Sequence, residues 1–154
     1  MSLILALGSN LGNSTQSLKQ AIELIHSSYP IIAQSQIYSS AAIEYEKQPD
    51  FLNMAIECEL PSSRPEEVME HLLSIESQLG RKREISKGPR TIDIDIIFWA
   101  TQSFAHDKVT IPHPAWQDRS FVVLPILELP YATILQQYFS FPKTFENTAS
   151  PVKD

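Results

Sequence analysis

The sequence is poor in cysteine, in long apolar runs and in positive charge, and each shortage excludes a class of protein. Cys58 is the single cysteine among 154 residues, so no intrachain disulfide is possible. Nowhere do 18 apolar residues follow one another, and the N-terminal apolar run covers only residues 3–7 with no basic residue before it. We therefore expect a cytoplasmic protein without a membrane partner. The formal net charge of −6 argues against a nucleic-acid partner, although a small polyanion can still bind locally.

The glycine-rich motifs that bind nucleotide phosphates are missing as well. Gly8 and Gly12 are too isolated to form such a loop, because neither Gly-Lys-Ser, Gly-Lys-Thr nor the pattern G-x-G-x-x-G occurs anywhere in the chain. A nucleotide, if one binds, must be held by other groups.

The hydrophobic residues, 43% of the chain, are enough for one domain with a core, which we assign to residues 1–142. Their spacing predicts strands and helices in the order β-α-β-β-α-β, with strands over residues 3–7, 31–38, 51–60 and 91–99. This order favours an α+β fold, a ferredoxin-like sandwich whose mostly antiparallel sheet is covered by helices. Residues 143–154 are polar and aperiodic, so we expect a loose C-terminal tail.

Several helix boundaries can also be predicted. Ser63, followed three residues later by Glu66, is typical of a capping box that opens a helix, and Gly80 is typical of its C-terminal end. Residues 116–128 and 131–138 are expected to add two further helical segments.

The segment around Asp93 and Asp95 carries the clearest chemical signal. Successive side chains of a strand point to opposite faces, so the two carboxylates should share one face with Ile97 and Trp99, while Ile94 and Phe98 share the other. Two like charges about 7 Å apart on an apolar strand need compensation by cations or hydrogen-bond donors. The alternative is a strand end whose aspartates simply reach solvent.

A basic segment directly precedes this strand. Five of the twelve Lys and Arg residues fall within ten positions, although the chain as a whole is acidic: Arg81, Lys82, Arg83, Lys87 and Arg90. A run of this kind is often a solvated loop, but beside an acidic pair it suits a magnesium–polyphosphate site. Magnesium takes one or two carboxylates together with phosphate oxygens and water, and arginine binds phosphate in a bidentate manner.

The motifs together resemble those of the 6-hydroxymethyl-7,8-dihydropterin pyrophosphokinase family of folate biosynthesis. The match extends from about residue 3 to about residue 130, and its motifs occur in the family's order: Ala6-Leu7-Gly8-Ser9-Asn10-Leu11-Gly12, Gln48-Pro49-Asp50-Phe51-Leu52-Asn53, Gly88-Pro89-Arg90-Thr91-Ile92-Asp93-Ile94-Asp95, and Ile111-Pro112-His113 with Arg119 and Phe121. The resemblance implies transfer of a pyrophosphoryl group from ATP to the hydroxymethyl oxygen of a reduced pterin, with release of AMP, by a monomer.

The resemblance also implies roles for individual residues. Two Mg²⁺ ions would be bound by Asp93 and Asp95, and either Asp95 or solvent would accept the hydroxyl proton. Catalytic contacts are implied for Asp93, Asp95, Arg81 and Arg90. Nucleotide contacts are implied for Glu76, Arg83, Lys108, Thr110, His113 and Arg119. Pterin contacts are implied for Ser40, Ile43, Glu44, Phe51, Asn53 and Phe121, with the two phenylalanines stacking on the ring.

Three departures from the family's usual pattern leave other interpretations open. Ser40-Ala41-Ala42 stands where prolines are usual, Lys87 stands where a tryptophan is common, and the loop from Arg81 to Lys87 is one residue shorter. One alternative is another Mg-dependent nucleotidyl or glycosyl transferase with a strand Asp-x-Asp. The other is a non-catalytic paralogue that binds pterin.

Overall fold

The computed structural model describes residues 1–10, 13–41, 50–80 and 92–152. Its elements follow the order strand, helix, three strands, helix, strand, and then short strands and helices: β1 (Ser2–Ser9), α1 (Ser14–Ser28), β2 (Ile31–Gln34), β3 (Tyr38–Ser40), β4 (Phe51–Glu59), α2 (Pro65–Gln78), β5 (Asp93–Trp99), β6 (Phe104–Ala105), β7 (Thr110–Ile111), the 3-10 helix η1 (Trp116–Asp118), α3 (Ser120–Leu127), α4 (Ala132–Tyr138) and β8 (Ala149–Pro151). None of these helices is both long enough and apolar enough to span a bilayer.

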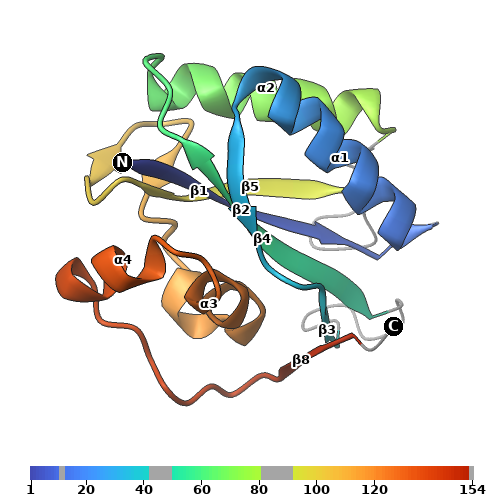
Figure 1. Ribbon diagram of the computed structural model, residues 1–154, viewed down its shortest axis with the longest axis vertical. Coiled ribbons are helices and arrows are strands. Elements are labelled where there is room, and N and C mark those ends of the chain that lie inside the picture. The colour runs from blue at the N-terminus through green and yellow to red at the C-terminus, as the bar shows by residue number, and fades with distance from the viewer. Residues whose placement is uncertain (11–12, 42–49, 81–91, 153–154) are drawn as a thin grey trace.

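The main sheet separates two apolar layers. Its strands are antiparallel in the order β5-β1-β4-β3-β8, and β2 also pairs with β4. Helices α1 and α2 cover one face, while α3 and α4 lie on the other (Figure 1). The larger core, between the sheet and α1 and α2, includes Leu5, Leu18, Leu72 and Ile94. The α+β sandwich predicted from the sequence is therefore confirmed.

A β-bulge in β5 corrects one part of the sequence prediction. The pairing with β1 shifts between Ile4, which faces Phe98, and Leu5, which faces Ile96, so Ile97 is an extra residue. Beyond the bulge the alternation of faces is inverted: Phe98 packs toward α3 and α4, whereas Trp99 packs with the α1–α2 core. The predicted faces of Phe98 and Trp99 were therefore wrong, while those of the residues before the bulge were right.

The predicted start of α2 was also wrong. The N-cap is Arg64, whose side chain makes no capping hydrogen bond, and Pro65 takes the first helical position. A proline there loses nothing, because that N–H has no partner within a helix. Ser63 consequently lies outside the helix, and Glu66 forms an ion pair with Arg64 instead of a capping box. At the other end, Gly80 follows the helix with φ of 88°, as a C-terminal glycine should.

The single strand expected over residues 31–38 is divided into β2 and β3. Ser35 lies between them, and its N–H and hydroxyl group both engage the backbone of Ala55: the N–H donates to the carbonyl at 2.9 Å and the hydroxyl accepts the N–H at 2.9 Å. A side chain that occupies a ladder position in this way interrupts the strand.

Just after this break in the chain, Glu128 at the end of α3 is hydrogen-bonded to Gln36 and to Tyr38 of β3. Its carboxylate accepts hydrogen bonds from the Tyr38 hydroxyl, from the Gln36 backbone N–H at 2.9 Å and from the Gln36 amide at 2.8 Å. Burial alone would raise the pKa of Glu128, but these hydrogen bonds outweigh it and the pKa is lowered. Burial, together with the same carboxylate, raises the pKa of Tyr38 to about 12.

We predict that Glu128→Gln is less stable than the wild type at neutral pH and that the difference shrinks in acid. A carboxyl group whose pKa is lowered by folding stabilises the folded state above its unfolded pKa of about 4.3, and that stability is lost as the pH falls through the folded pKa. Urea unfolding of both proteins between neutral pH and about pH 3 measures this. A difference that is constant with pH would contradict the assignment.

The C-terminal segment, expected to be loose, is partly ordered. Residues 149–151 form β8, which pairs with β3, and the Val152 N–H donates to the Ile37 carbonyl at 2.9 Å. Asn147 occupies the start of α3: its Oδ1 accepts the Ser120 N–H at 2.8 Å and the Ser120 hydroxyl at 2.5 Å, and its Nδ2 donates to the Asp118 carbonyl at 2.7 Å. The prediction of a loose tail is wrong here, because these contacts are polar and leave no apolar pattern in the sequence.

Asn147 therefore supplies the cap that Arg119, the N-cap residue of α3, does not provide. We expect Asn147→Ala to lower the free energy of unfolding by about 1–2 kcal/mol, the usual cost of losing a capping side chain. Chemical denaturation measures the change, and Asn147→Asp, which keeps the acceptor oxygen, should recover part of it. A loss below about 0.3 kcal/mol would show that the cap contributes little.

Candidate functional site

The register of three neighbouring strands assembles the centre of the candidate site. Gly8 on β1 lies between Asn53 on β4 and Asp93 on β5, and two residues earlier Ala6 lies between Ala55 and Asp95. Residues directly paired across antiparallel strands point to the same face. That face is the one toward α3, because Ala55 belongs to the core on that side and Ala6 packs against it. Small residues thus form a floor, with an amide at one side and two carboxylates at the other.

Gly8 leaves open the space above β1 because it has no side chain. A β-carbon at this position would lie 3.2 Å from Asn53 Oδ1 and 3.9 Å from Phe51 Cδ1, which is tighter than most real contacts in the first case. The close approach of the Asn53 side chain, and not an unusual φ, favours glycine here, because a larger residue would have to displace the Asn53 amide. The space above β1 is therefore preserved between Asn53 and Asp93.

Asn53 is held in place on the pterin side implied by the resemblance. It is buried, and its Nδ2 donates to the Ser40 hydroxyl at 2.7 Å and to the Phe51 carbonyl at 3.4 Å. Phe51 and Ser40 are paired residues of β4 and β3, so both lie on the face of Asn53. Three of the predicted pterin contacts therefore come together, and Ile43 and Glu44 lie outside the described residues.

The segment after β7 brings His113 and Arg119 toward Asp93. The His113 N–H donates to the Ile97 carbonyl at 3.1 Å, which ties this segment to β5, and its Nδ1 accepts the Ala115 N–H at 3.2 Å. A neutral imidazole so placed carries its proton on Nε2 and can donate it. Burial lowers the pKa of His113, the Arg119 guanidinium lowers it further, and Asp93 opposes both, so Arg119 and Asp93 each lie within electrostatic reach of His113.

Arg119 and Phe121 flank the first residue of α3. The Arg119 guanidinium carbon lies 5.8 Å from the centre of the Phe121 ring, within the range of a cation–π contact. Phe121 is half-buried against the core beneath α3. The capping by Asn147 fixes the helix start that carries both side chains, a contribution that the sequence did not reveal.

Glu76, predicted to contact the nucleotide, is buried on α2 and bonded to the backbone of β5. It is only 2% exposed. Its Oε2 accepts the backbone N–H of Ile94 at 2.7 Å, between the two aspartates.

Lys108 and Thr110 are both exposed, Lys108 in the turn between β6 and β7 and Thr110 at the start of β7. Lys108 Nζ contacts Glu70 Oε1 on α2 at 2.6 Å, and this ion pair raises the pKa of Lys108 and lowers that of Glu70. Thr110 lies in β7. The predictions for Arg81, Arg83 and Arg90 concern residues outside the described part of the chain.

The metal ligands implied by the resemblance are a pair rather than a cluster. Within residues 1–10, 13–41, 50–80 and 92–152, no three His, Cys, Asp or Glu side chains are arranged to hold a metal ion. Asp93 and Asp95 are both half-buried on the same face of β5. One or two carboxylates completed by phosphate oxygens and water are the usual magnesium set, so the residues present fit Mg²⁺ bound together with a nucleotide.

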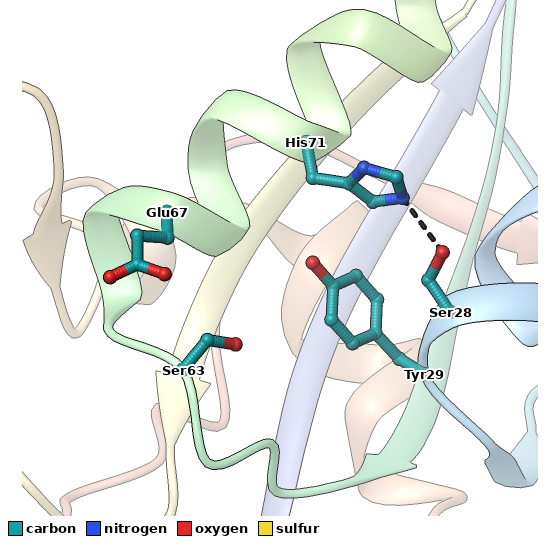
Figure 2. A pocket seen from close by; sticks show the side chains of 5 residues that line it. All are labelled: Ser28, Tyr29, Ser63, Glu67 and His71. Atoms are coloured by element: carbon teal, nitrogen blue, oxygen red, sulfur yellow. Dashed lines mark hydrogen bonds between the residues drawn. The ribbon is translucent and has the colours of Figure 1, made fainter.

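A pocket of about 210 Å³ lies on the opposite side of the sheet. Ser28, Tyr29, Ser63, Glu67 and His71 line it, between α1 and α2 (Figure 2). The Ser28 hydroxyl group lies 2.9 Å from His71 Nε2, and the Tyr29 ring meets the imidazole edge-on. This pocket lies beyond the α1–α2 core from Asp93 and Asp95, so it is separate from the candidate site.

Comparison with known proteins identifies what the chain is similar to. Residues 4–131 match the family described as 7,8-dihydro-6-hydroxymethylpterin-pyrophosphokinase (HPPK). A 2-amino-4-hydroxy-6-hydroxymethyldihydropteridine pyrophosphokinase of Bacillus subtilis is 39% identical over 127 residues, which are 81% of this chain and 75% of that protein. A protein of the same name from Aquifex aeolicus is 34% identical over 149 residues, 96% of this chain and 92% of that protein.

Longer proteins contain a similar region. A mitochondrial folate synthesis bifunctional protein of Arabidopsis thaliana is 35% identical over 128 residues, but the chain spans only 23% of its length. Among solved structures, an HPPK-DHPS protein of Plasmodium falciparum superposes with a TM-score of 0.65 at 14% identity, over 90% of this chain and 43% of that one. At that identity the likeness shows the fold alone.

Proposed function

The chain belongs to the 7,8-dihydro-6-hydroxymethylpterin-pyrophosphokinase family, and we propose that it transfers a pyrophosphoryl group from ATP to the hydroxymethyl group of 6-hydroxymethyl-7,8-dihydropterin at the face that carries Asp93 and Asp95. It is a pyrophosphokinase of folate synthesis, and AMP is the second product of this reaction. The observation that supports the location best is the register that sets Asn53, Gly8 and Asp93 side by side, with Asp95 and Ala6 next to them.

The pterin end of the site would lie over Asn53. Its amide oxygen faces Gly8, and its amide nitrogen is already bonded to Ser40, so the orientation of the donor and acceptor is fixed. Phe51 and Phe121 would stack on the ring, each adding about 1 kcal/mol beyond the area buried. Ile43 and Glu44 would complete these contacts. A planar, hydrogen-bonding substrate suits this combination of an oriented amide and aromatic rings.

The phosphate end would lie over Asp93 and Asp95. These carboxylates would hold two Mg²⁺ ions with the triphosphate, and the bound ions would supply the positive charge that phosphoryl transfer requires. His113, neutral and with its proton on Nε2, would donate a hydrogen bond to a phosphate oxygen, and the guanidinium of Arg119 would add charge beside it. Arg81, Arg83 and Arg90 would supply further phosphate contacts, and Lys108 and Thr110 would lie toward the nucleoside.

Pterin-dependent formation of AMP tests the proposed function. Protein incubated with ATP, Mg²⁺ and the reduced hydroxymethylpterin should release AMP in a one-to-one ratio with the pterin pyrophosphate, measured by ion-exchange chromatography. Omitting the pterin should abolish AMP release. Formation of ADP, or of AMP without pterin, would indicate another nucleotide-using transferase, and pterin binding without AMP would indicate a non-catalytic paralogue.

Phe121→Ala should weaken pterin binding by about tenfold or more while nucleotide binding changes less than twofold, because the ring is proposed to contact only the pterin. Calorimetric titration of each ligand measures both values. Equal weakening of pterin and nucleotide binding, together with lower thermal stability, would show that Phe121 serves the core alone.

We further propose that the protein acts as a monomer in the cytoplasm, where its two small substrates are dissolved.

A further inference from the structure

Glu76 is a carboxylate in an unusual place. It lies on α2, on the α1–α2 side of the sheet, and is 2% exposed. Carboxylates are seldom so buried unless they are paired or hydrogen-bonded, because removing the charge from water is costly. Its Oε2 accepts the N–H of Ile94 at 2.7 Å, a short, charge-assisted hydrogen bond to the backbone.

This bond acts on the backbone between the two proposed metal ligands. The Ile94 N–H belongs to the peptide group that joins Asp93 to Ile94, and Asp95 follows directly. The Ile94 side chain points toward α2, while those of Asp93 and Asp95 point to the opposite face. Since β5 is the end strand of the described sheet, the bond from α2 restrains its outer edge as β1 restrains its inner edge.

The helix that carries Glu76 is itself firmly placed. Two residues of α2 near Glu76 are buried in the same core as Ile94 and Ile96: Ile75, which precedes it, and Leu72, one turn earlier. The carboxylate therefore projects from a packed helix and not from a loop, so it can hold the strand in position.

We propose that Glu76 is a positioning residue that fixes the backbone of β5 so that Asp93 and Asp95 present their carboxylates with the spacing a metal–nucleotide complex needs. This role rests on the proposed function of that face. Mg²⁺ demands near-ideal octahedral geometry at about 2.1 Å, so a small displacement of one ligand weakens binding. Groups that orient metal ligands without touching the metal typically change its affinity by about 10–100-fold when removed.

Two substitutions separate positioning from other roles. Glu76→Gln keeps an oxygen that can accept the Ile94 N–H but removes the charge, whereas Glu76→Met keeps similar bulk without an acceptor. The probes are the hydrogen exchange of the Ile94 amide, followed by NMR, and calorimetric binding of Mn²⁺ with a nonhydrolysable ATP analogue. A third measurement is binding of the same analogue without metal.

We expect Glu76→Met to speed exchange at Ile94 by about tenfold or more and to weaken Mn²⁺ binding by about tenfold, while analogue binding without metal stays within about twofold. Glu76→Gln should stay close to the wild type in all three. Glu57→Gln is the matched control, because Glu57 is also a buried carboxylate that accepts a backbone N–H, from Tyr131 at 3.0 Å. It should leave Mn²⁺ binding unchanged, and it should speed Ile94 exchange by no more than its overall loss of stability accounts for.

Three outcomes would overturn the proposal. Unchanged Ile94 exchange in Glu76→Met would show that the bond does not hold β5. Equal loss of Mn²⁺ binding in both variants would make the charge, and not the backbone contact, responsible. Weaker binding of the metal-free analogue would instead indicate direct contact with the nucleotide. If the wild type forms no AMP from ATP and pterin, the proposed function fails, but the exchange and Mn²⁺ measurements still decide the role of Glu76.

Discussion

Replacing Asp95 or Asp93 with alanine is expected to reduce AMP formation by at least about a thousandfold, equivalent to about 4 kcal/mol of transition-state stabilisation. Each carboxylate is proposed to hold Mg²⁺ against the triphosphate, and the described residues place no third carboxylate with them. Stability should not fall in parallel. Without Mg²⁺, removing one of two neighbouring negative charges relieves repulsion, so the thermal midpoint should stay level or rise.

Asp107→Ala provides the control for this experiment. Asp107 is an exposed aspartate in the turn between β6 and β7, so its loss should leave both turnover and thermal stability unchanged. AMP formation that survives in both Asp93→Ala and Asp95→Ala would remove the metal assignment. A large drop in the thermal midpoint of either variant would show instead that the aspartates serve the fold.

Replacing Glu57 with alanine is expected to lower the free energy of unfolding by about 3 kcal/mol, through loss of a buried acceptor. Glu57 is 4% exposed in the middle of β4. Its Oε1 accepts the Tyr131 N–H at 3.0 Å and its Oε2 accepts the Ser2 hydroxyl at 2.8 Å, so one carboxylate joins the segment before α4 to the first residue of β1. Without it, both donors are left buried and unpaired. Urea denaturation measures the loss.

Glu57→Gln and Ser2→Ala separate the contributions of the two hydrogen bonds of Glu57 to stability. Glutamine keeps one acceptor oxygen and should lose about half as much stability, while Ser2→Ala removes only one donor and should cost about 1 kcal/mol. Since Glu57 takes no part in the proposed site, the activity of the folded fraction of Glu57→Gln should be normal. An alanine variant within about 0.5 kcal/mol of the wild type would mean that water replaces the carboxylate.

The alternation along β5 was enough to predict that Asp93 and Asp95 share one face of the sheet. Asp93 and Asp95 were expected opposite Ile94, and this is confirmed because period-2 alternation is a local property of a strand. Asn53 and Ala55 share one face of β4 by the same alternation. The bulge at Ile97 could not be predicted, since a bulge depends on how two strands pair and not on one strand's pattern.

The contacts between segments far apart in the sequence were harder to predict. Glu57 alternates with the apolar residues of β4, but the side on which it lies is covered by α3 and α4 and the residue is buried. The cap that Asn147 provides for α3 joins residues 27 positions apart, and the bond from Glu76 to Ile94 joins residues 18 apart. Each depends on the tertiary arrangement, and a single polar residue carries no periodic signal of it.

Paramagnetic broadening by Mn²⁺ tests most directly the claim that nucleotide and metal bind on the Asp93–Asp95 face. With a nonhydrolysable ATP analogue present, substoichiometric Mn²⁺ should broaden the amide resonances of Ala6, Asp95 and Ala55, which lie side by side on β1, β5 and β4. The amides of Ser28 and His71, in the pocket on the other side of the sheet, should stay sharp. Broadening centred on Ser28 and His71, or equal broadening at both places, would contradict the account.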